Sequence, residues 1–148
     1  MLDALVGTWS GPGRGVYPTI VDFEYEETIE FSRVPGKPFL VYVQKTKGAN
    51  GPMHTEMGFL RPIADGKVEF VIAQPTGQTE ILDGEVSGSS MAFDASNVQN
   101  STTAKQVDAT KRVYALEGDT LRTEFFMAAV GQPMQRHLSS VLTRSSRM

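Results

Sequence analysis

Hydrophobic and polar residues alternate with a period of two along most of the chain. Between residues 22 and 34, one face carries Phe23, Tyr25, Ile29 and Phe31, while the other carries mainly glutamate, threonine and serine. Such alternation is typical of a β-strand with one face in the core and the other in water. Over the whole sequence it predicts ten strands, near residues 5–16, 22–34, 39–47, 54–61, 68–74, 79–86, 90–95, 105–116, 121–130 and 134–143.

Short segments with Gly, Pro, Asn and Asp separate or interrupt these strands, at residues 34–38, 49–52, 65–66, 75–77, 83–84, 118–119 and 131–133. Glycine reaches positive φ, proline presets φ, and Asn or Asp tolerates the left-handed region, so we interpret these segments as hairpin turns. Successive strands are therefore expected to pair as antiparallel neighbours. Residues 96–103, rich in Ser, Thr and Asn, are expected to form a longer mobile loop. No segment carries a helical stripe of more than about two turns.

A meander of ten strands leaves two unpaired edges unless it closes on itself. Closure into a barrel removes both edges. Eight strands already leave space for one small ligand, and ten leave more. We therefore expect residues 1–148 to form a single all-β domain, a ten-stranded antiparallel, lipocalin-like β-barrel that encloses a cavity or an open cleft.

Composition narrows the classes of partner. The chain has 148 residues, 40% of them hydrophobic and 21% charged, which suits one globular core. Its net charge is −3 and its Lys and Arg residues are scattered, so no nucleic acid is expected as a partner. Cysteine is absent, and we find neither a basic leader nor an apolar run of membrane-spanning length. We therefore expect no membrane partner and a cytoplasmic location.

A glycine-rich element, Gly7-Thr-Trp9-Ser-Gly11-Pro-Gly13-Arg-Gly15, lies near the N-terminus. Glycines at alternate positions leave bare backbone along one strand face, which permits sharp coiling or the close approach of another chain. Trp9 has the size to plug one end of a barrel. The element does not favour a phosphate-binding loop, because neither Lys-Ser/Thr nor a helix follows the glycines.

Only two histidines occur, His54 and His137. Two histidines without cysteine exclude a three-histidine zinc centre and make a closed structural zinc site hard to build. One neutral imidazole is sufficient on the proximal side of a haem iron, although a lone histidine in a strand is more often a half-exposed polar residue. Strand alternation groups Met134 with Leu138 and Leu142, which places His137 on the opposite face with Ser139 and Val141.

Other polar residues carry weaker signals. Thr19 follows Pro18 and has a hydroxyl that a ligand oxygen could accept, but such threonines are commonly turn residues. Lys105 is by itself most simply a solvated lysine at a loop end. No Gly-x-Ser-x-Gly elbow supports hydrolysis, and the glutamates at 24, 26 and 30 form a solvated strand face. The methionines, including those at 53, 57, 91 and 127, are interpreted as adaptable wall residues, with an axial thioether as the minor alternative.

Several of these elements occur together in one protein family. The chain combines Gly7-x-Trp-x-Gly-x-Gly13, Gly15-Val-Tyr-Pro-Thr-Ile20, Gly36-Lys-Pro-Phe-Leu-x-Tyr-x-Gln-x-Thr46, Pro52-Met-His-Thr-Glu-x-Gly-Phe-Leu-Arg61 and Ala128-Ala-Val-Gly-Gln-Pro-Met-Gln-Arg-His-Leu138. Joined in this order over essentially the whole chain, they resemble the nitrobindin family.

The resemblance implies a ten-stranded barrel with one haem b per chain in a wide surface cleft. It implies ferric iron, Fe(III), held by His137 as the proximal ligand, with His54 lining the pocket and with Thr19 and Lys105 against the porphyrin. It further implies binding of nitric oxide and isomerisation of peroxynitrite to nitrate, with no catalytic group beyond the haem iron. The small-molecule ligands are thus peroxynitrite and nitric oxide.

Two other interpretations remain open at this point. A non-enzymatic lipocalin-like carrier or sensor of haem, nitric oxide or another hydrophobic ligand would explain the cavity equally well. A purely structural adaptor would be favoured by a large exposed apolar patch, which this evenly alternating sequence does not suggest. Either a monomer or a homodimer is compatible with the sequence.

Overall fold

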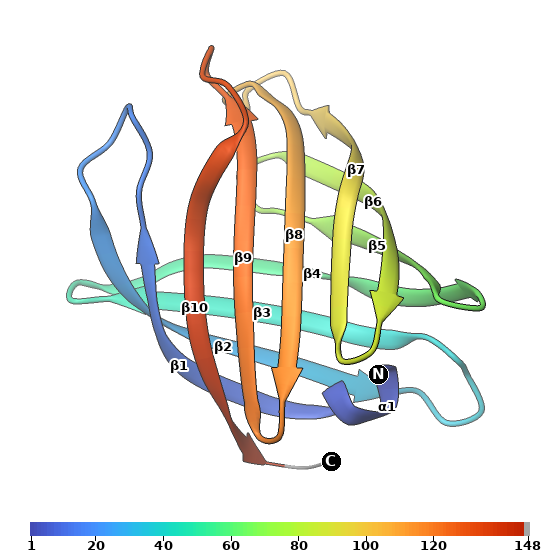
Figure 1. Cartoon of the computed structure of the whole chain (residues 1–148). Coiled ribbons are helices and arrows are strands. Elements are labelled where there is room, and N and C mark those ends of the chain that lie inside the picture. The colour runs from blue at the N-terminus through green and yellow to red at the C-terminus, as the bar shows by residue number, and fades with distance from the viewer. Residues whose placement is uncertain (147–148) are drawn as a thin grey trace.

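The computed structural model describes residues 1–146 and is a closed, all-β barrel of ten antiparallel strands, as predicted (Figure 1). One helical turn, α1 (Leu2–Leu5), precedes the strands. The strands are β1 (Gly7–Gly15), β2 (Phe23–Arg33), β3 (Leu40–Gly48), β4 (Gly51–Ala64), β5 (Lys67–Ala73), β6 (Gln78–Ser87), β7 (Ser90–Asn100), β8 (Val107–Glu117), β9 (Thr120–Ala129) and β10 (Gln135–Ser146). Each of the ten predicted strands corresponds to one of them.

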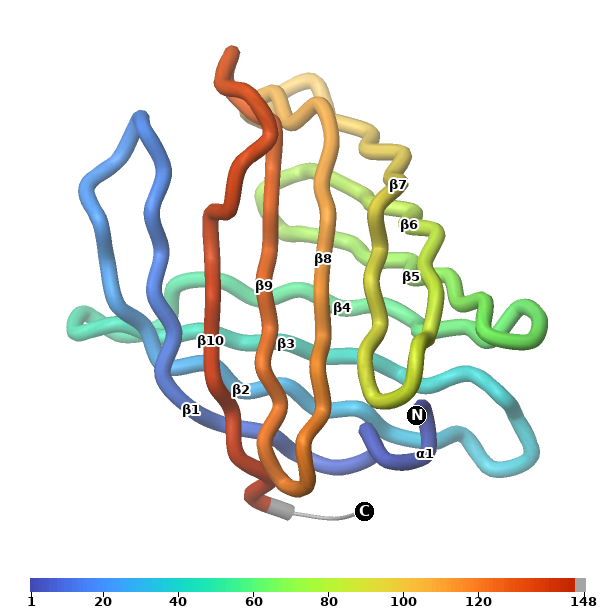
Figure 2. The backbone as a smooth tube through the Cα atoms, viewed as in Figure 1, coloured from blue at the N-terminus to red at the C-terminus, as the bar shows by residue number. Residues whose placement is uncertain are grey.

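Every strand pairs with the next one along the chain, and β1 also pairs with β10, which closes the barrel. Strands β7 to β10 form one wall, and β2 to β5 pass behind it in another direction (Figure 2). In an up-and-down barrel, alternate connections lie at the same end. The connections β1–β2, β3–β4, β5–β6, β7–β8 and β9–β10 therefore share one end, here named the open end, and α1 lies with the remaining connections at the closed end.

Large apolar side chains fill the closed end. Trp9 is fully buried there, and its indole N–H donates to the carbonyl oxygen of Leu5 at 2.8 Å, which ties the end of α1 to the start of β1. The predicted plug is confirmed. Residues 2–5 form α1, so the first strand begins at Gly7, not at Leu5. The buried core that continues from Trp9 comprises Leu5, Val6, Ile29, Phe31, Leu40, Tyr42, Leu60, Val68, Phe70, Ile72, Leu82, Met91, Phe93, Tyr114, Leu121 and Leu142.

Two local predictions were wrong. Residues 96–100 continue strand β7 instead of forming a mobile loop, because their backbone pairs in register with β6 from Ser96 to Asn100. Residues 83–84 form a bulge within β6, not a hairpin turn. Gly84 is required there because a Cβ would lie 2.4 Å from the ring of Phe93. The turn itself follows at Gly88, which has a φ of 60°.

Within residues 1–146, no helix is long and apolar enough to cross a membrane.

Candidate functional site: a cavity with two histidines

The open end of the barrel contains a cavity of about 580 Å³. This volume falls within the range of about 300–1,000 Å³ that is typical of small-molecule sites. Thr19, His54, Lys105 and His137, the four residues singled out in the sequence, all line it. They come from the β1–β2 connection, β4, the β7–β8 connection and β10, so only the closed barrel brings them together.

The imidazole of His137 is held by the strand beside it. Its Nδ1 lies 3.0 Å from the carbonyl oxygen of Val16, and the backbone N–H of Val16 donates to the carbonyl oxygen of His137 at 2.8 Å. A carbonyl can only accept, so Nδ1 carries the proton and donates it to Val16. In the neutral ring this leaves the lone pair on Nε2, which has no hydrogen-bond partner among the described residues. A second-shell carbonyl of this kind is what commonly orients a metal-binding histidine.

Burial lowers the pKa of His137 from its ordinary value, and the hydrogen bond to Val16 only partly offsets this effect. The ring is therefore neutral at physiological pH. A neutral imidazole with a free Nε2 is the form that binds a metal ion. Tautomer and charge thus both suit His137 as a ligand.

The predicted alternation in β10 was wrong at this position. His137 and Leu138 both line the cavity, although a regular strand would point them to opposite faces. The pairing of β10 with β9 shifts between Arg136 and Leu138, which makes His137 an extra residue in the strand. Such a β-bulge redirects side chains and breaks the period of two.

Three aromatic rings surround His137. The centroid of the Tyr17 ring lies 5.2 Å from that of the imidazole, and those of Phe23 and Phe125 each lie at 6.2 Å. Tyr17 is itself fixed, because its hydroxyl accepts the N–H of Ala129 at 3.0 Å and lies 3.2 Å from the carbonyl oxygen of Met127. The rings make an apolar side of the cavity, against which a flat apolar ligand can pack. None of the three was assigned to the site from the sequence.

His54 lies on the wall opposite His137, since β4 and β10 are four strands apart in the ten-stranded barrel. Its Nε2 is 3.2 Å from Oε1 of Glu56, and its backbone N–H donates to the hydroxyl of Thr46 at 3.1 Å. The two histidines therefore differ in their surroundings. The Nε2 of His137 is free, whereas that of His54 is engaged by a buried carboxylate.

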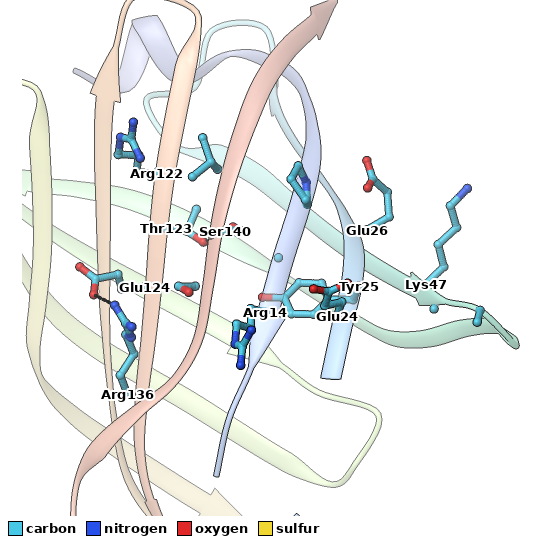
Figure 3. A pocket seen from close by; sticks show the side chains of 16 residues that line it. Arg14, Glu24, Tyr25, Glu26, Lys47, Arg122, Thr123, Glu124, Arg136 and Ser140 are labelled. Carbon is cyan, nitrogen blue, oxygen red and sulfur yellow. Dashed lines mark hydrogen bonds and ion pairs between the residues drawn. The ribbon is translucent and has the colours of Figure 1, made fainter. Parts of the chain in front are cut away.

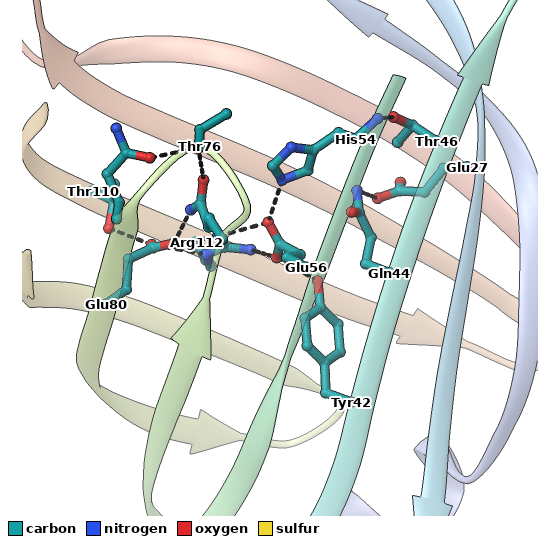
Figure 4. A network of polar contacts seen from close by, with 12 residues as sticks. Glu27, Tyr42, Gln44, Thr46, His54, Glu56, Thr76, Glu80, Thr110 and Arg112 are labelled. Carbon is teal, nitrogen blue, oxygen red and sulfur yellow. Dashed lines mark hydrogen bonds and ion pairs between the residues drawn. The ribbon is translucent and has the colours of Figure 1, made fainter. Parts of the chain in front are cut away.

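A buried ionic network lies beside this wall (Figure 4). The guanidinium of Arg112 lies between two glutamates, with Nη1 at 2.7 Å from Oε2 of Glu56 and Nη2 at 2.7 Å from Oε2 of Glu80. Tyr42 donates its hydroxyl to Glu56 at 2.8 Å, and Thr110 donates to Glu80 at 2.6 Å. All five side chains are buried and line the cavity. The cavity is therefore apolar on the side of His137 and polar deeper in the barrel.

The charges of this network are fixed by its geometry. Burial would raise the pKa of Glu56, but the charge and hydrogen bonds of Arg112, together with the hydrogen bond from His54, outweigh burial and hold that pKa at about 2. Burial would likewise lower the pKa of Arg112, yet the carboxylates of Glu56 and Glu80 raise it well above its ordinary value. Both partners of the pair are therefore ionised at neutral pH. The guanidinium also covers the ring of Phe125 at 4.7 Å and so links the network to the aromatic side.

Glu27 behaves differently from Glu56. It is buried on β2 and lines the cavity, where its carboxylate accepts hydrogen bonds from Ser140 and from the side-chain amide of Gln44, the latter at 2.8 Å. No cation contacts it among the described residues. Burial raises the pKa of Glu27, and the two hydrogen bonds offset only part of this rise.

The remaining predicted site residues lie at the rim of the cavity. Thr19 and Lys105 both line the cavity and are exposed to solvent there. Of the four methionines interpreted as wall residues, Met53 and Met127 line the cavity. Met57 points outward and is 55% exposed, and Met91 is fully buried in the core, so for these two the interpretation was wrong.

Comparisons with known proteins agree with this geometry. A sequence model of the family described as "THAP4-like, heme-binding beta-barrel domain" matches residues 1–144. A protein of Nocardia farcinica named peroxynitrite isomerase is 44% identical over 97% of this chain and 88% of its own length. A protein of Mycobacterium ulcerans named peroxynitrite isomerase 2 is 47% identical over 98% of this chain and 93% of its own.

A solved structure also matches the fold. The crystal structure of Rv2717c from M. tuberculosis aligns with a TM-score of 0.88 at 45% identity, covering 95% of this chain and 92% of that one. The family inferred from the sequence motifs is thereby confirmed. This chain belongs to the THAP4-like, heme-binding β-barrel domain family.

Proposed function

We propose that this chain binds one haem b through His137 and isomerises peroxynitrite to nitrate. The observation that carries the proposal is the state of His137, a neutral imidazole whose Nδ1–H is held by Val16 and whose Nε2 is free. The relatives named peroxynitrite isomerase support the reaction, and membership of a heme-binding family supports the cofactor.

The residues of the cavity fit a haem by their chemistry. A porphyrin is flat and apolar at its centre and carries carboxylates at one edge. The rings of Tyr17, Phe23 and Phe125 provide an apolar side next to His137. Thr19 and Lys105 provide a hydroxyl and an ammonium at the exposed rim, where the propionates would remain in contact with water. Because Lys105 is exposed, we expect its charge to contribute little to affinity.

The protein contributes position and enclosure to the reaction. His137 would hold the haem iron through its free Nε2, whereas the Nε2 of His54 on the opposite wall is engaged by Glu56. When bound, the haem would supply an iron to which a small ligand such as peroxynitrite or nitric oxide could bind. The buried side chains on the cavity wall, including Tyr42, Glu56 and Arg112, would help to shield a reactive ligand from bulk water.

The first test is the visible absorption spectrum of the protein mixed with one equivalent of ferric haem. We expect a saturable Soret shift in the parent protein and in His54→Ala, and its loss in His137→Ala. His54→Ala is the matched control because it removes the other imidazole of the same cavity. An unchanged Soret shift in a folded His137→Ala protein would refute His137 as the ligand.

The second test is the rate of peroxynitrite decay and the yield of nitrate. The haem-loaded parent should accelerate the decay above the background of free haem, and His137→Ala should not. A protein that binds haem without any such acceleration would instead be a carrier or sensor. Nitric oxide binding to the ferric form is checked by the same spectral method.

A further inference from the structure

His54 and Glu56 lie two residues apart on β4, so their side chains share one face of the strand, and both line the cavity (Figure 4). Nε2 of His54 is 3.2 Å from Oε1 of Glu56. The other ring nitrogen, Nδ1, forms no hydrogen bond within the part of the chain that the structure describes. The side chain of His54 is 28% exposed, whereas that of Glu56 is only 5% exposed. His54 is therefore accessible and is fixed by a buried carboxylate.

The direction of this hydrogen bond follows from the charge of Glu56. Its pKa is about 2, so the carboxylate is ionised at neutral pH and can only accept. Nη1 of Arg112 and the hydroxyl of Tyr42 donate to its Oε2 at 2.7 and 2.8 Å, which fixes its position. The proton of a neutral His54 ring must therefore be on Nε2, and the lone pair on Nδ1. A histidine base that is oriented by a carboxylate in this way recurs in catalytic triads.

The charges around the pair favour one more proton. The titratable and charged groups that interact with Glu56 or with Arg112 are His54, Glu27, Tyr42, Glu80 and Tyr114. Arg112 is bonded to two carboxylates, those of Glu56 and Glu80, so two negative charges face one positive charge. A proton on Nδ1 of His54 would place an imidazolium beside Glu56 and balance the surplus. Paired buried charges are far less costly than unpaired ones.

We propose that His54 accepts the proton of weak-acid ligands in the haem cavity and that Glu56 positions it for this step. The inference rests on the proposed function, because it concerns ligands that enter the haem cavity. Near neutral pH, peroxynitrite is present partly as its conjugate acid, which must lose a proton to become the anion. The O–H bond of the acid breaks, an N–H bond forms on Nδ1 of His54, and Nε2 continues to donate to Glu56. After nitrate has left, the partly exposed ring releases the proton to water.

Nitrogen NMR of the haem-free protein tests the tautomer, because protonated and unprotonated ring nitrogens have well-separated shifts. The neutral ring of His54 should carry its proton on Nε2 in the parent, and His54→Gln identifies its signals. In Glu56→Gln, the amide oxygen can keep the bonds from Arg112 and Tyr42 while the amide NH₂ faces His54, so the proton should move to Nδ1. A proton on Nδ1 in the parent, or the same tautomer in both proteins, would overturn the proposal.

Cyanide offers a stable weak-acid probe for the haem-loaded proteins, since it is mostly hydrogen cyanide at neutral pH and binds ferric haem as the anion. Stopped-flow association of cyanide should be about a hundredfold slower in His54→Gln and in Glu56→Gln than in the parent, the low end of what a positioned proton acceptor contributes. Nitric oxide is of similar size and binds without losing a proton. Its association rate should therefore be the same in all three proteins.

The matched control is Glu26→Gln, which removes a carboxylate from the outer face of the barrel. Glu26 is exposed on β2 and lines an outer groove of about 930 Å³ (Figure 3). Cyanide and nitric oxide should both associate with this variant as fast as with the parent.

Equal cyanide rates in His54→Gln and the parent would overturn the proposal, as would an equal slowing of cyanide and nitric oxide. Failure of haem to bind at all would show in the parent spectrum and would count against the proposed function. The two failures are therefore distinguishable.

Discussion

The ring of Phe23 packs on the bare backbone of Gly15, so closely that a Cβ on Gly15 would lie 2.2 Å from Cζ of Phe23. The two residues are cross-strand partners on β1 and β2. Gly13 and Tyr25 repeat this relationship one pair further along, where a Cβ would lie 2.3 Å from the ring. Because Phe23 also borders His137, the N-terminal glycines provide the space for rings that support the imidazole.

Gly15→Ala should therefore disturb the site as well as the fold. The added methyl group must displace the Phe23 ring, and overpacking of this kind costs about 1–3 kcal/mol of unfolding free energy. Urea denaturation measures that loss, and titration with ferric haem should show weaker binding. The double variant Gly15→Ala with Phe23→Leu restores space and should recover part of the stability. Unchanged stability and haem affinity in the single variant would contradict the packing argument.

Tyr17→Phe should loosen the segment that holds His137. The Tyr17 hydroxyl accepts the N–H of Ala129 at 3.0 Å, and its removal leaves that buried donor without its partner. The expected cost is about 1–3 kcal/mol of unfolding free energy. Haem transfer to an acceptor protein should also become faster, because Val16, which immediately precedes Tyr17, orients the imidazole of His137. An unchanged transfer rate would show that Val16 is held independently of Tyr17.

The barrel was predictable from the sequence because every strand must bury one face, and the alternation of apolar and polar residues shows which face that is. The site was less predictable than the barrel. The shift in register at His137 breaks the alternation of inward and outward side chains in β10, and no residue in the sequence marks the position of this bulge. The resemblance of the motifs, not the alternation, identified His137 as a candidate ligand.

The buried network could have been found from the same alternation. Glu27 shares the inward face of β2 with Tyr25 and Ile29, and Arg112 shares that of β8 with Tyr114. A charged residue at an inward position must find a partner or change its protonation state. The partner could not be read from the sequence, because Arg112 and Glu56 are 56 residues apart and meet only across the closed barrel.

Arg112→Met should destabilise the protein strongly. Removal of the guanidinium leaves the carboxylates of Glu56 and Glu80 buried without their cation, which costs about 3–5 kcal/mol. Urea denaturation at neutral pH measures the loss. The triple variant with Glu56→Gln and Glu80→Gln removes the unpaired charges and should recover most of it. If the triple variant were no more stable than Arg112→Met, the cost would have to come from lost packing.

Arg144→Met should reduce stability without affecting the cavity. The guanidinium carbon of Arg144 lies 4.1 Å from the centroid of a Trp9 ring, and its nitrogens donate to the carbonyl oxygens of Val6 and Ala4, both at 2.7 Å. These contacts hold α1 over the closed end, and we expect a loss of about 1–3 kcal/mol. The Soret shift with ferric haem should be unchanged. A weaker haem affinity would mean that the two ends of the barrel are coupled.

The protonation of His137 should make the stability of the ligand-free protein depend on pH. Its pKa is lower in the folded protein than the ordinary value of 6.5, mainly through burial. As the pH falls, the unfolded chain therefore takes up the proton first and is favoured. The contribution of His137 is fully present above a pH of about 6.5 and is lost as the pH falls through its folded pKa.

The stability difference between the parent and His137→Gln isolates this contribution. Measured by urea denaturation, the parent should lose more unfolding free energy than the variant as the pH is lowered from about 8 to 5. An NMR titration of the His137 ring protons gives the folded pKa directly and must place it below 6.5. A folded pKa above that value would mean that the charged ring is stabilised in the cavity, and the neutral, ligand-ready imidazole would have to be abandoned.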